Sequence, residues 1–110
     1  MVQSKTELFD KGLAEKAELF KVLAHPARLR ILQFLAETRS CITGDISDEL
    51  PLGRTTVNQH LKELKNVGLI QGHIDGVKTN YCLDPAKVKE LQVSLQSFLE
   101  RIQTKDYTCK

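Results

Sequence analysis

A chain of 110 residues, 41% of them hydrophobic, is long enough for one domain with a modest core. Aromatic residues make up only 5% and tryptophan is absent, so the core is expected to be aliphatic and mainly helical. The net charge of +2 excludes no class of partner, although residues 41–50 carry −3 (three acids, no base) and residues 51–80 carry +2 (four bases, two acids). The basic segment suits an anionic partner, with ordinary surface charge as the alternative.

Neither the N-terminus, MVQSKTELFD, nor any later segment has an apolar run typical of a signal peptide or a membrane span. We therefore expect a cytoplasmic protein with no membrane partner, in which the three cysteines stay reduced. The chain also lacks a serine–histidine pair at catalytic spacing, a glycine-rich phosphate loop and an HExxH motif. Neither enzyme activity nor a cofactor is expected.

The first predicted element is a helix over about residues 5–24, preceded by Ser4 and Glu7 at the spacing of a capping box. One broad apolar stripe follows this helix and contains Leu8, Phe9, Leu13, Ala17, Phe20 and Leu23. Such a stripe needs a surface to cover, either in the core of this chain or on a partner.

His25-Pro26 ends the first helix, and Pro26 suits the first turn of a second one, PARLRILQFLAET. That segment is apolar nearly all round, so we place it at the centre of the domain. His25 has two interpretations: a helix cap or packing residue, which is the more common role of a lone histidine at a helix junction, or a ligand or acid–base group.

A short third helix is predicted over GDISDEL, with Ser40 or Thr43 as its cap and Pro51 after its end. The turn Leu52-Gly53 then leads into a longer helix, RTTVNQHLKELKNV. Helix, short turn and helix over about residues 43–67 form a helix-turn-helix. Backbone amides at the start of its second helix can hold a phosphate.

The longer helix has two different faces. Val57, Leu61 and Leu64 recur at helical spacing and predict a buried face. The opposite face has hydroxyl, amide and ammonium groups but no carboxylate, and it contains Thr55, Asn58, Gln59, Lys62, Lys65 and Asn66. Amides and hydroxyls bond to base edges in the major groove and lysines bond to phosphates, so this face is the candidate contact with DNA.

Gly68 ends the helix, and residues 69–83 predict a two-stranded ribbon with Asp75-Gly76 as its hairpin turn. A helix followed by such a ribbon is the pattern of a winged helix-turn-helix. Asp84-Pro85 begins a last helix over about residues 85–104. Its apolar stripe, which we expect to be buried in a dimer, contains Leu91, Leu95, Phe98, Leu99 and Ile102.

The predicted fold is thus mainly α with a small β-hairpin wing, in the order α-α-α-α-β-β-α. Three of its segments, LAHPARLRIL, GDISDELPLGRTTVNQHLKELKNVGLI and IDGVKTNYCLDP, resemble the ArsR/SmtB family of winged-helix repressors. The resemblance implies a homodimer built from the first and last helices, which would use Leu8, Phe9, Leu13, Leu91, Leu95, Phe98, Leu99 and Ile102. It also implies one recognition helix per subunit in successive major grooves of an inverted repeat in double-stranded DNA.

Matched by position, the resemblance assigns base and phosphate contacts to Arg54, Thr55, Thr56, Asn58 and Gln59. It places His60 and Lys62 beside the DNA backbone, and Lys78, on the wing, near a flanking groove or phosphate. Two positions depart from the family pattern, because Gly53 stands where serine is usual and Arg54 where glutamine is common. The departures imply a weaker helix cap and a higher local charge.

The cysteines leave three interpretations open. The family's Cys-x-Cys metal motif is present only in part, since Cys41-Ile42-Thr43 keeps one thiol, and the last helix has no histidine for an interfacial zinc site. Cys41 and Cys109 together could hold a soft metal or arsenite, which needs two or three thiolates. Alternatively all three cysteines, with Cys82 alone on the return strand, are unrelated free thiols, or one exposed thiol is reversibly oxidised.

These features favour a dimeric, sequence-specific DNA-binding regulator, most simply a repressor that occludes an inverted-repeat operator. One alternative is a winged-helix protein-interaction module, whose recognition face would carry acidic or bulky apolar residues. The other is a thiol-based repressor that responds to redox state or to a soft metal through Cys41 and Cys109.

Overall fold

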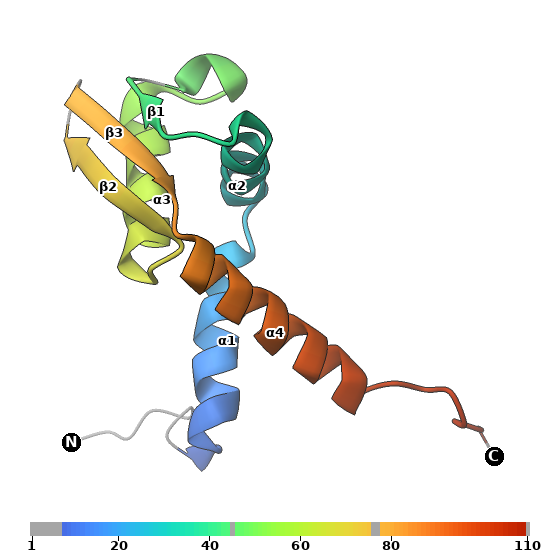
Figure 1. Cartoon of the computed structure of the whole chain (residues 1–110). Helices are drawn as coiled ribbons and strands as arrows, with labels where there is room; N and C mark the ends of the chain where they lie inside the picture. Colours follow the sequence, from blue (N-terminus) through green and yellow to red (C-terminus); the bar gives the residue numbers. More distant parts are fainter. Residues whose placement is uncertain (1–7, 45, 76–77, 110) are drawn as a thin grey trace.

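The computed structural model describes residues 8–44, 46–75 and 78–109 of the chain (Figure 1). In chain order its elements are α1 (Lys11–Leu23), α2 (Pro26–Thr38), β1 (Ile42–Thr43), the 3₁₀ turn η2 (Ser47–Glu49), α3 (Arg54–Asn66), β2 (Ile70–Asp75), β3 (Lys78–Leu83) and α4 (Pro85–Arg101). Helices α2 and α3 lie together with the sheet and form the winged-helix part of the domain, and α1 and α4 extend away from it (Figure 1). The predicted winged helix-turn-helix fold is confirmed in its main elements.

The core lies between α2, α3 and the sheet. The apolar face of α3 is fully buried at Val57, Leu61 and Leu64, as its helical spacing predicts. It packs with Ile31 and Leu35 of α2, and the cluster is completed by Ile46, Leu50, Leu69, Ile70, Ile74, Tyr81 and Leu91. Truncating a leucine at such a site typically lowers stability by about 2–5 kcal/mol, so this cluster holds α3 in position.

Three helices begin at side-chain caps. Nδ1 of His25 accepts a hydrogen bond from the backbone N–H of Ala27 (3.1 Å), with Pro26 in the first turn of α2. The interpretation of His25 as a cap is therefore confirmed. Asp84 likewise accepts from the N–H groups of Ala86 and Lys87 at the start of α4.

Helix α1 begins later than predicted. Asp10 is its N-cap and accepts from the backbone N–H of Leu13, so residues 8–10 precede the helix and the predicted start near residue 5 is wrong. The proposed capping box of Ser4 and Glu7 lies outside the described residues. Every side chain of α1 keeps some exposure, because none of its 13 residues is fully buried.

Helix α3 ends in a Schellman motif, which requires a left-handed residue after the last turn. Gly68 has φ of +87°, its N–H bonds to the carbonyl of Lys65, and the N–H of Leu69 reaches back to the carbonyl of Leu64 (3.1 Å). The motif turns the chain sharply from α3 into the wing, and Leu64 and Leu69 on either side of the turn are buried in the core.

The sheet has one strand more than predicted. Its order is β1-β3-β2 with both pairs antiparallel, and Ile42 of β1 faces Tyr81 of β3. Gly44, with φ of +99°, exchanges hydrogen bonds with Thr79: its N–H donates to the Thr79 carbonyl, and Oγ1 of Thr79 donates to its carbonyl. The pairing draws residues 42–44 to the edge of the sheet, and the helix predicted over residues 44–50 is wrong, because the described part of this segment forms only the single 3₁₀ turn η2.

The predicted ribbon over residues 69–83 is confirmed as β2 and β3, with Gln71 facing Cys82 and His73 facing Asn80. Its expected Asp75-Gly76 turn falls partly outside the described residues, which stop at Asp75 and resume at Lys78. Within the described ranges, no helix is both long enough and apolar enough to cross a membrane.

Candidate nucleic-acid interface

The outer face of α3 carries exposed polar side chains. Thr55, Gln59, Lys62 and Asn66 recur every three to four residues, opposite the buried leucines, and all are exposed. Arg54 and Thr56 are exposed in the first turn, and Asn58 is half-buried at the edge of the face. These residues present hydroxyl, amide and cationic groups on one surface, as predicted, and Glu63 is the one acid in α3.

The N-terminus of α3 is open to an anion. Gly53 occupies the cap position with no side-chain hydrogen bond to the first-turn amides, and the first turn has no acidic residue. A helix N-terminus carries a partial positive charge and unpaired N–H groups. This end of the helix is therefore suited to a phosphate, with Arg54 beside it.

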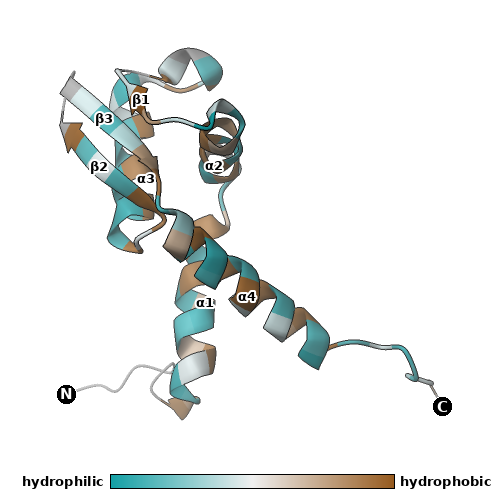
Figure 2. Cartoon of the chain, in the orientation of Figure 1, coloured by the Kyte–Doolittle hydropathy of each residue, from teal (hydrophilic) through white to brown (hydrophobic). Residues whose placement is uncertain are grey.

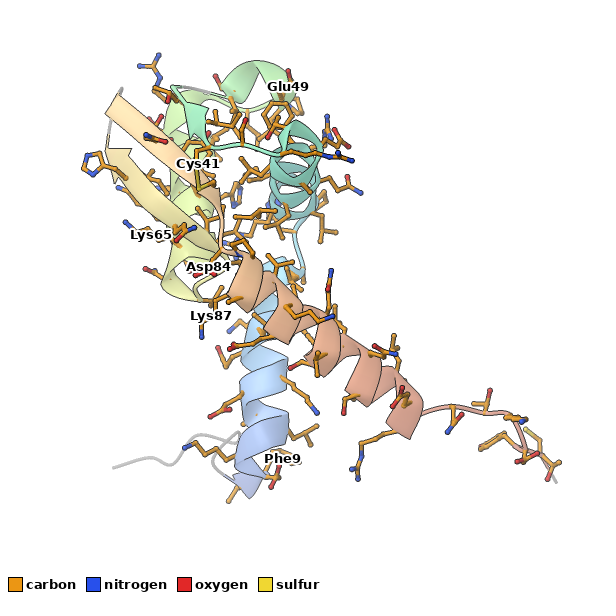
Figure 3. All side chains as sticks on the ribbon, in the orientation of Figure 1. Phe9, Cys41, Glu49, Lys65, Asp84 and Lys87 are labelled. Atoms are coloured by element: carbon orange, nitrogen blue, oxygen red, sulfur yellow. A yellow bond between two sulfur atoms is a disulfide. The ribbon has the colours of Figure 1, made fainter. Side chains whose placement is uncertain are left out.

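Lys65 joins the recognition helix to the wing. Its Nζ donates a hydrogen bond to the carbonyl of Gly72 on β2 (2.6 Å), and Figure 3 shows Lys65 on the side of α3 that faces this strand. Gly72 has φ of +121°, and a Cβ there would clash with the carbonyl oxygen of Asn80 on β3. The hydrogen bond from Lys65 therefore ties the wing to α3, and the close approach of β2 and β3 explains why glycine is needed at position 72.

His60 lies inside the protein, so its predicted place beside a DNA backbone is wrong. Its side chain is 8% exposed, and its ring packs against that of His25 with 4.3 Å between centroids. Nδ1 of His60 accepts a hydrogen bond from Nε of Arg28 (3.0 Å), and Arg28 also donates to the carbonyl of Val22 (3.1 Å). His60 and Arg28 thus hold α3 against α2 and the end of α1.

The protonation of His60 is expected to make the fold sensitive to acid. Burial, then the charges of His25 and Arg28, lower the pKa of His60 below its usual 6.5 in the folded state. The unfolded chain then binds this proton more tightly, so stability is present above pH 6.5 and declines as the pH falls through the lowered pKa. Urea unfolding at pH 7.5 and below 6 should show this decline.

The His60→Gln variant should lose that part of the pH dependence while keeping an acceptor for Arg28. His73, which is exposed on β2, supplies a matched control, because His73→Gln should leave the decline unchanged. Equal slopes for wild type and His60→Gln would show that another group is responsible.

The remaining predicted DNA contact is Lys78. It is the first residue of β3, next to the tip of the wing, and its side chain is outside what the structure describes.

The apolar stripes predicted for the first and last helices lie partly in the core and partly on the surface. Leu91 is 9% exposed and belongs to the core of its own chain, which corrects its assignment to a dimer interface, and Leu95 packs partly against the same core. The rings of Phe20 and Phe98 meet edge to face at 5.7 Å, joining α1 to α4. The stripes continue on the surface as Leu8, Phe9, Leu13, Leu99 and Ile102, which are 47–72% exposed. Figure 2 shows hydrophobic (brown) positions recurring along α1 and α4, and Figure 3 shows Phe9 near the start of α1.

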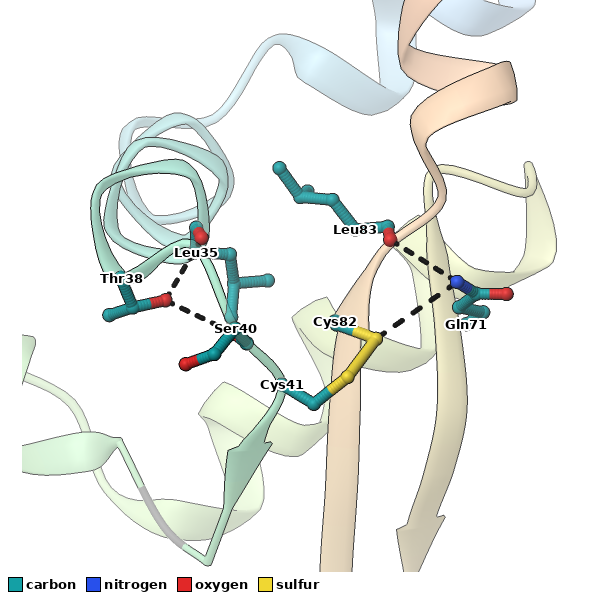
Figure 4. Close-up of a disulfide and its surroundings, with 7 residues drawn as sticks. All are labelled: Leu35, Thr38, Ser40, Cys41, Gln71, Cys82 and Leu83. Atoms are coloured by element: carbon teal, nitrogen blue, oxygen red, sulfur yellow. Dashed lines mark hydrogen bonds between the residues drawn. A yellow bond between two sulfur atoms is a disulfide. The ribbon is translucent and has the colours of Figure 1, made fainter.

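Cys41 and Cys82 form a disulfide, so neither the set of three free thiols nor the Cys41/Cys109 pair is found (Figure 4). The bond continues the antiparallel register, since Ile42 faces Tyr81 and the next opposed positions are Cys41 and Cys82. Cys109 has an exposed free thiol. Among the described residues, no group of three or more histidine, cysteine or acidic side chains is placed to hold a metal.

Comparisons with known proteins agree with this architecture. Residues 25–71 match the profile of the family described as bacterial regulatory protein, arsR family. The HTH-type transcriptional regulator Rv0081 of Mycobacterium tuberculosis is 33% identical over 87 residues, which are 79% of this chain and 76% of that protein. Its crystal structure superposes with a TM-score of 0.62 at 31% identity, covering 86% of this chain and 94% of that chain.

Two further relatives are also described as transcriptional regulators. The HTH-type transcriptional regulator MJ1325 of Methanocaldococcus jannaschii is 37% identical over 75 residues, which are 68% of this chain and 84% of that protein. A homologue of the cadmium resistance transcriptional regulatory protein CadC from Staphylococcus aureus is 27% identical over 89 residues, 81% of this chain and 74% of that protein.

Proposed function

Because this chain belongs to the ArsR family of bacterial transcriptional regulators, we propose that it is a homodimeric repressor of an inverted-repeat operator in double-stranded DNA. The observation that carries the proposal is the outer face of α3, where polar and cationic side chains lie beside an uncapped helix N-terminus. The protein then acts in the cytoplasm by binding rather than by catalysis.

The outer face of α3 suits the major groove. A helix of 13 residues is about 20 Å long, and a groove about 12 Å wide admits it with its side chains. Thr55, Asn58 and Gln59 would meet base edges, whereas Arg54, Thr56 and Lys62 would meet phosphates. Lys65 is already bonded to Gly72, so its contribution would be to hold the wing in place.

A second copy of the chain would cover the apolar residues that one chain leaves exposed. Leu13 on α1, Leu99 on α4 and Ile102 just after α4 are large apolar side chains, 47%, 59% and 55% exposed. Large apolar side chains exposed on two neighbouring elements are typical of an interface, and a two-fold dimer buries the same surface on both copies. Such a dimer would present two α3 helices to the two halves of an inverted repeat.

Two substitutions on α3 separate phosphate contacts from base reading. An operator is first selected from a random duplex library by the purified protein, and binding is then measured over a range of salt concentrations. Lys62→Gln should weaken binding to every sequence and reduce the salt slope by about 0.9 for each phosphate that the lysine no longer neutralises. Gln59→Ala should instead weaken the selected operator by about 1–3 kcal/mol and relax preference at one position of each half-site.

Lys105→Gln, which removes a distant exposed lysine after α4, is the matched control and should change neither quantity. Unaltered affinity and preference in both α3 variants would refute the assignment of α3 as the recognition helix. A wild-type protein with no affinity for any duplex in dilute salt would favour a protein-interaction module instead.

A further inference from the structure

A cavity of about 610 Å³ opens beside the Cys41–Cys82 disulfide. It lies between the end of α2, the residues just before β1, strands β2 and β3, and the first turns of α4. Its apolar wall includes Leu35, Leu83 and Val88, and both sulfur-bearing residues line it. A disulfide is thus placed on the wall of a hollow large enough for a small organic molecule.

The charged side chains that line this cavity are both cationic. Arg39 and Lys89 line it from α2 and α4, and both are exposed. No acidic side chain is among the described residues that line it. The cavity therefore favours a molecule with an apolar part and a negative charge.

We propose that Cys41–Cys82 is a thiol–disulfide exchange site whose cavity selects small organic thiols that carry a carboxylate. Disulfides in cytoplasmic proteins are usually transient, and thiolates are the groups that open them. The inference takes a cytoplasmic location from the proposed function, but it concerns the disulfide itself and does not depend on operator binding.

The surroundings of the two sulfurs indicate which one is attacked. Cys41 is exposed, whereas Cys82 is half-buried on β3. Nε2 of Gln71 donates a long hydrogen bond to Sγ of Cys82 (4.0 Å) while also donating to the carbonyl of Leu83 (3.4 Å), as Figure 4 shows. Cys41 is the more accessible sulfur and therefore the target, and the Gln71 amide lies on the side of Cys82, the sulfur that would leave.

The exchange runs in two balanced steps. The thiolate of the small molecule bonds to Sγ of Cys41 as the Cys41–Cys82 bond breaks, and the electron pair goes to Cys82, which takes a proton from water. A second thiolate then attacks the sulfur of the small molecule in the mixed disulfide and releases Cys41. The protein disulfide gains two electrons, and two small thiols become one small disulfide.

The test compares thiols of different charge on the oxidised protein, in a Cys109→Ser background that removes the third thiol. The three thiols are 3-mercaptopropionate (negative), 2-mercaptoethanol (neutral) and cysteamine (positive). The rate at which each thiol reduces the protein is divided by the rate at which the same thiol reduces a small uncharged disulfide at the same pH. Alkylation and mass spectrometry follow the loss of the protein disulfide. The negative thiol should react about 3- to 10-fold faster than the neutral one, the positive thiol more slowly, and salt should compress the differences.

Two variants and one control identify the cause of the preference. Arg39→Gln combined with Lys89→Gln should abolish the charge order, whereas Lys87→Gln should keep it, because Lys87 pairs with Glu90 and does not line this cavity. Gln71→Leu should slow all three thiols alike. Acid-trapped mixed disulfide should map to Cys41.

Four results would overturn the proposal: a disulfide that resists all three thiols, equal normalised rates, a charge order that survives the double variant, or mixed disulfide on Cys82. The assay contains no DNA. A failure of this site is therefore distinct from a failure of operator binding.

Discussion

Replacing Leu99 with glutamate is expected to split the dimer and to lower operator affinity by about 100-fold or more. Leu99 is 59% exposed on α4, so the charge is tolerated by the single chain but would be buried without a partner in the dimer. A monomer engages only one half-site and loses the effective concentration that links the two binding events. Sedimentation gives the oligomeric state, and operator titration at fixed salt gives the affinity.

The same helix offers a control for this substitution. Val93 is also exposed, but it lies about 200° around α4 from the buried Leu91, at 100° per residue, and so faces away from the stripe. Val93→Glu should keep both the dimer and its affinity. A Leu99→Glu protein that stays dimeric at micromolar concentration would place the interface elsewhere.

Removing the disulfide, through Cys41→Ser with Cys82→Ser, is expected to lower the free energy of unfolding by about 3–4 kcal/mol. The bond joins residues that are 41 positions apart, and its loss restores the conformational entropy of that loop to the unfolded chain. The backbone pairing of Gly44 with Thr79 remains, so the native sheet should survive. Urea unfolding at one protein concentration measures the change.

Cys109→Ser serves as the control, because its thiol is exposed near the end of the chain, and the expected change is within about 0.5 kcal/mol. Reducing the wild type should reproduce the effect of the double variant. A double variant that unfolds at the same urea concentration as the oxidised wild type would contradict the loop-closure explanation.

The elements that depend on local spacing were predictable from the sequence. The period of Val57, Leu61 and Leu64 identifies the buried face of α3, and the positive φ of Gly68 follows from its place after the last helical turn. Asp84-Pro85 marks the start of α4 for the same kind of reason. Each of these signals lies within a few residues of the structure it specifies.

Features that depend on distant partners were not predictable in this way. Strand β1 has two residues and exists because β3 lies beside it, so the Cys41–Cys82 bond could only be found by first pairing these strands. The burial of Leu91 in its own chain was also not predictable, because the apolar pattern of the last helix is the same where it contacts the core and where it is exposed.

His60 is a different case, because a local signal was present. It lies three residues after Val57 and four before Leu64, which places it on the buried side of α3. The position matched by the family resemblance placed His60 beside DNA instead, and this assignment is wrong. Its hydrogen bond from Arg28, 32 residues away, was not available from the sequence.

The absence of any fully buried residue from α1 has a consequence for assembly. An isolated helix of 13 residues is marginal in water, and this one gains only partial cover from its own chain. Its first turns, around the exposed Leu13, should therefore become ordered as two copies meet, because the last turns already pack against the core through Leu19 and Val22. Dilution should then melt the start of this helix before the rest of the domain unfolds. Mass action then makes the helical content and the melting temperature rise with protein concentration.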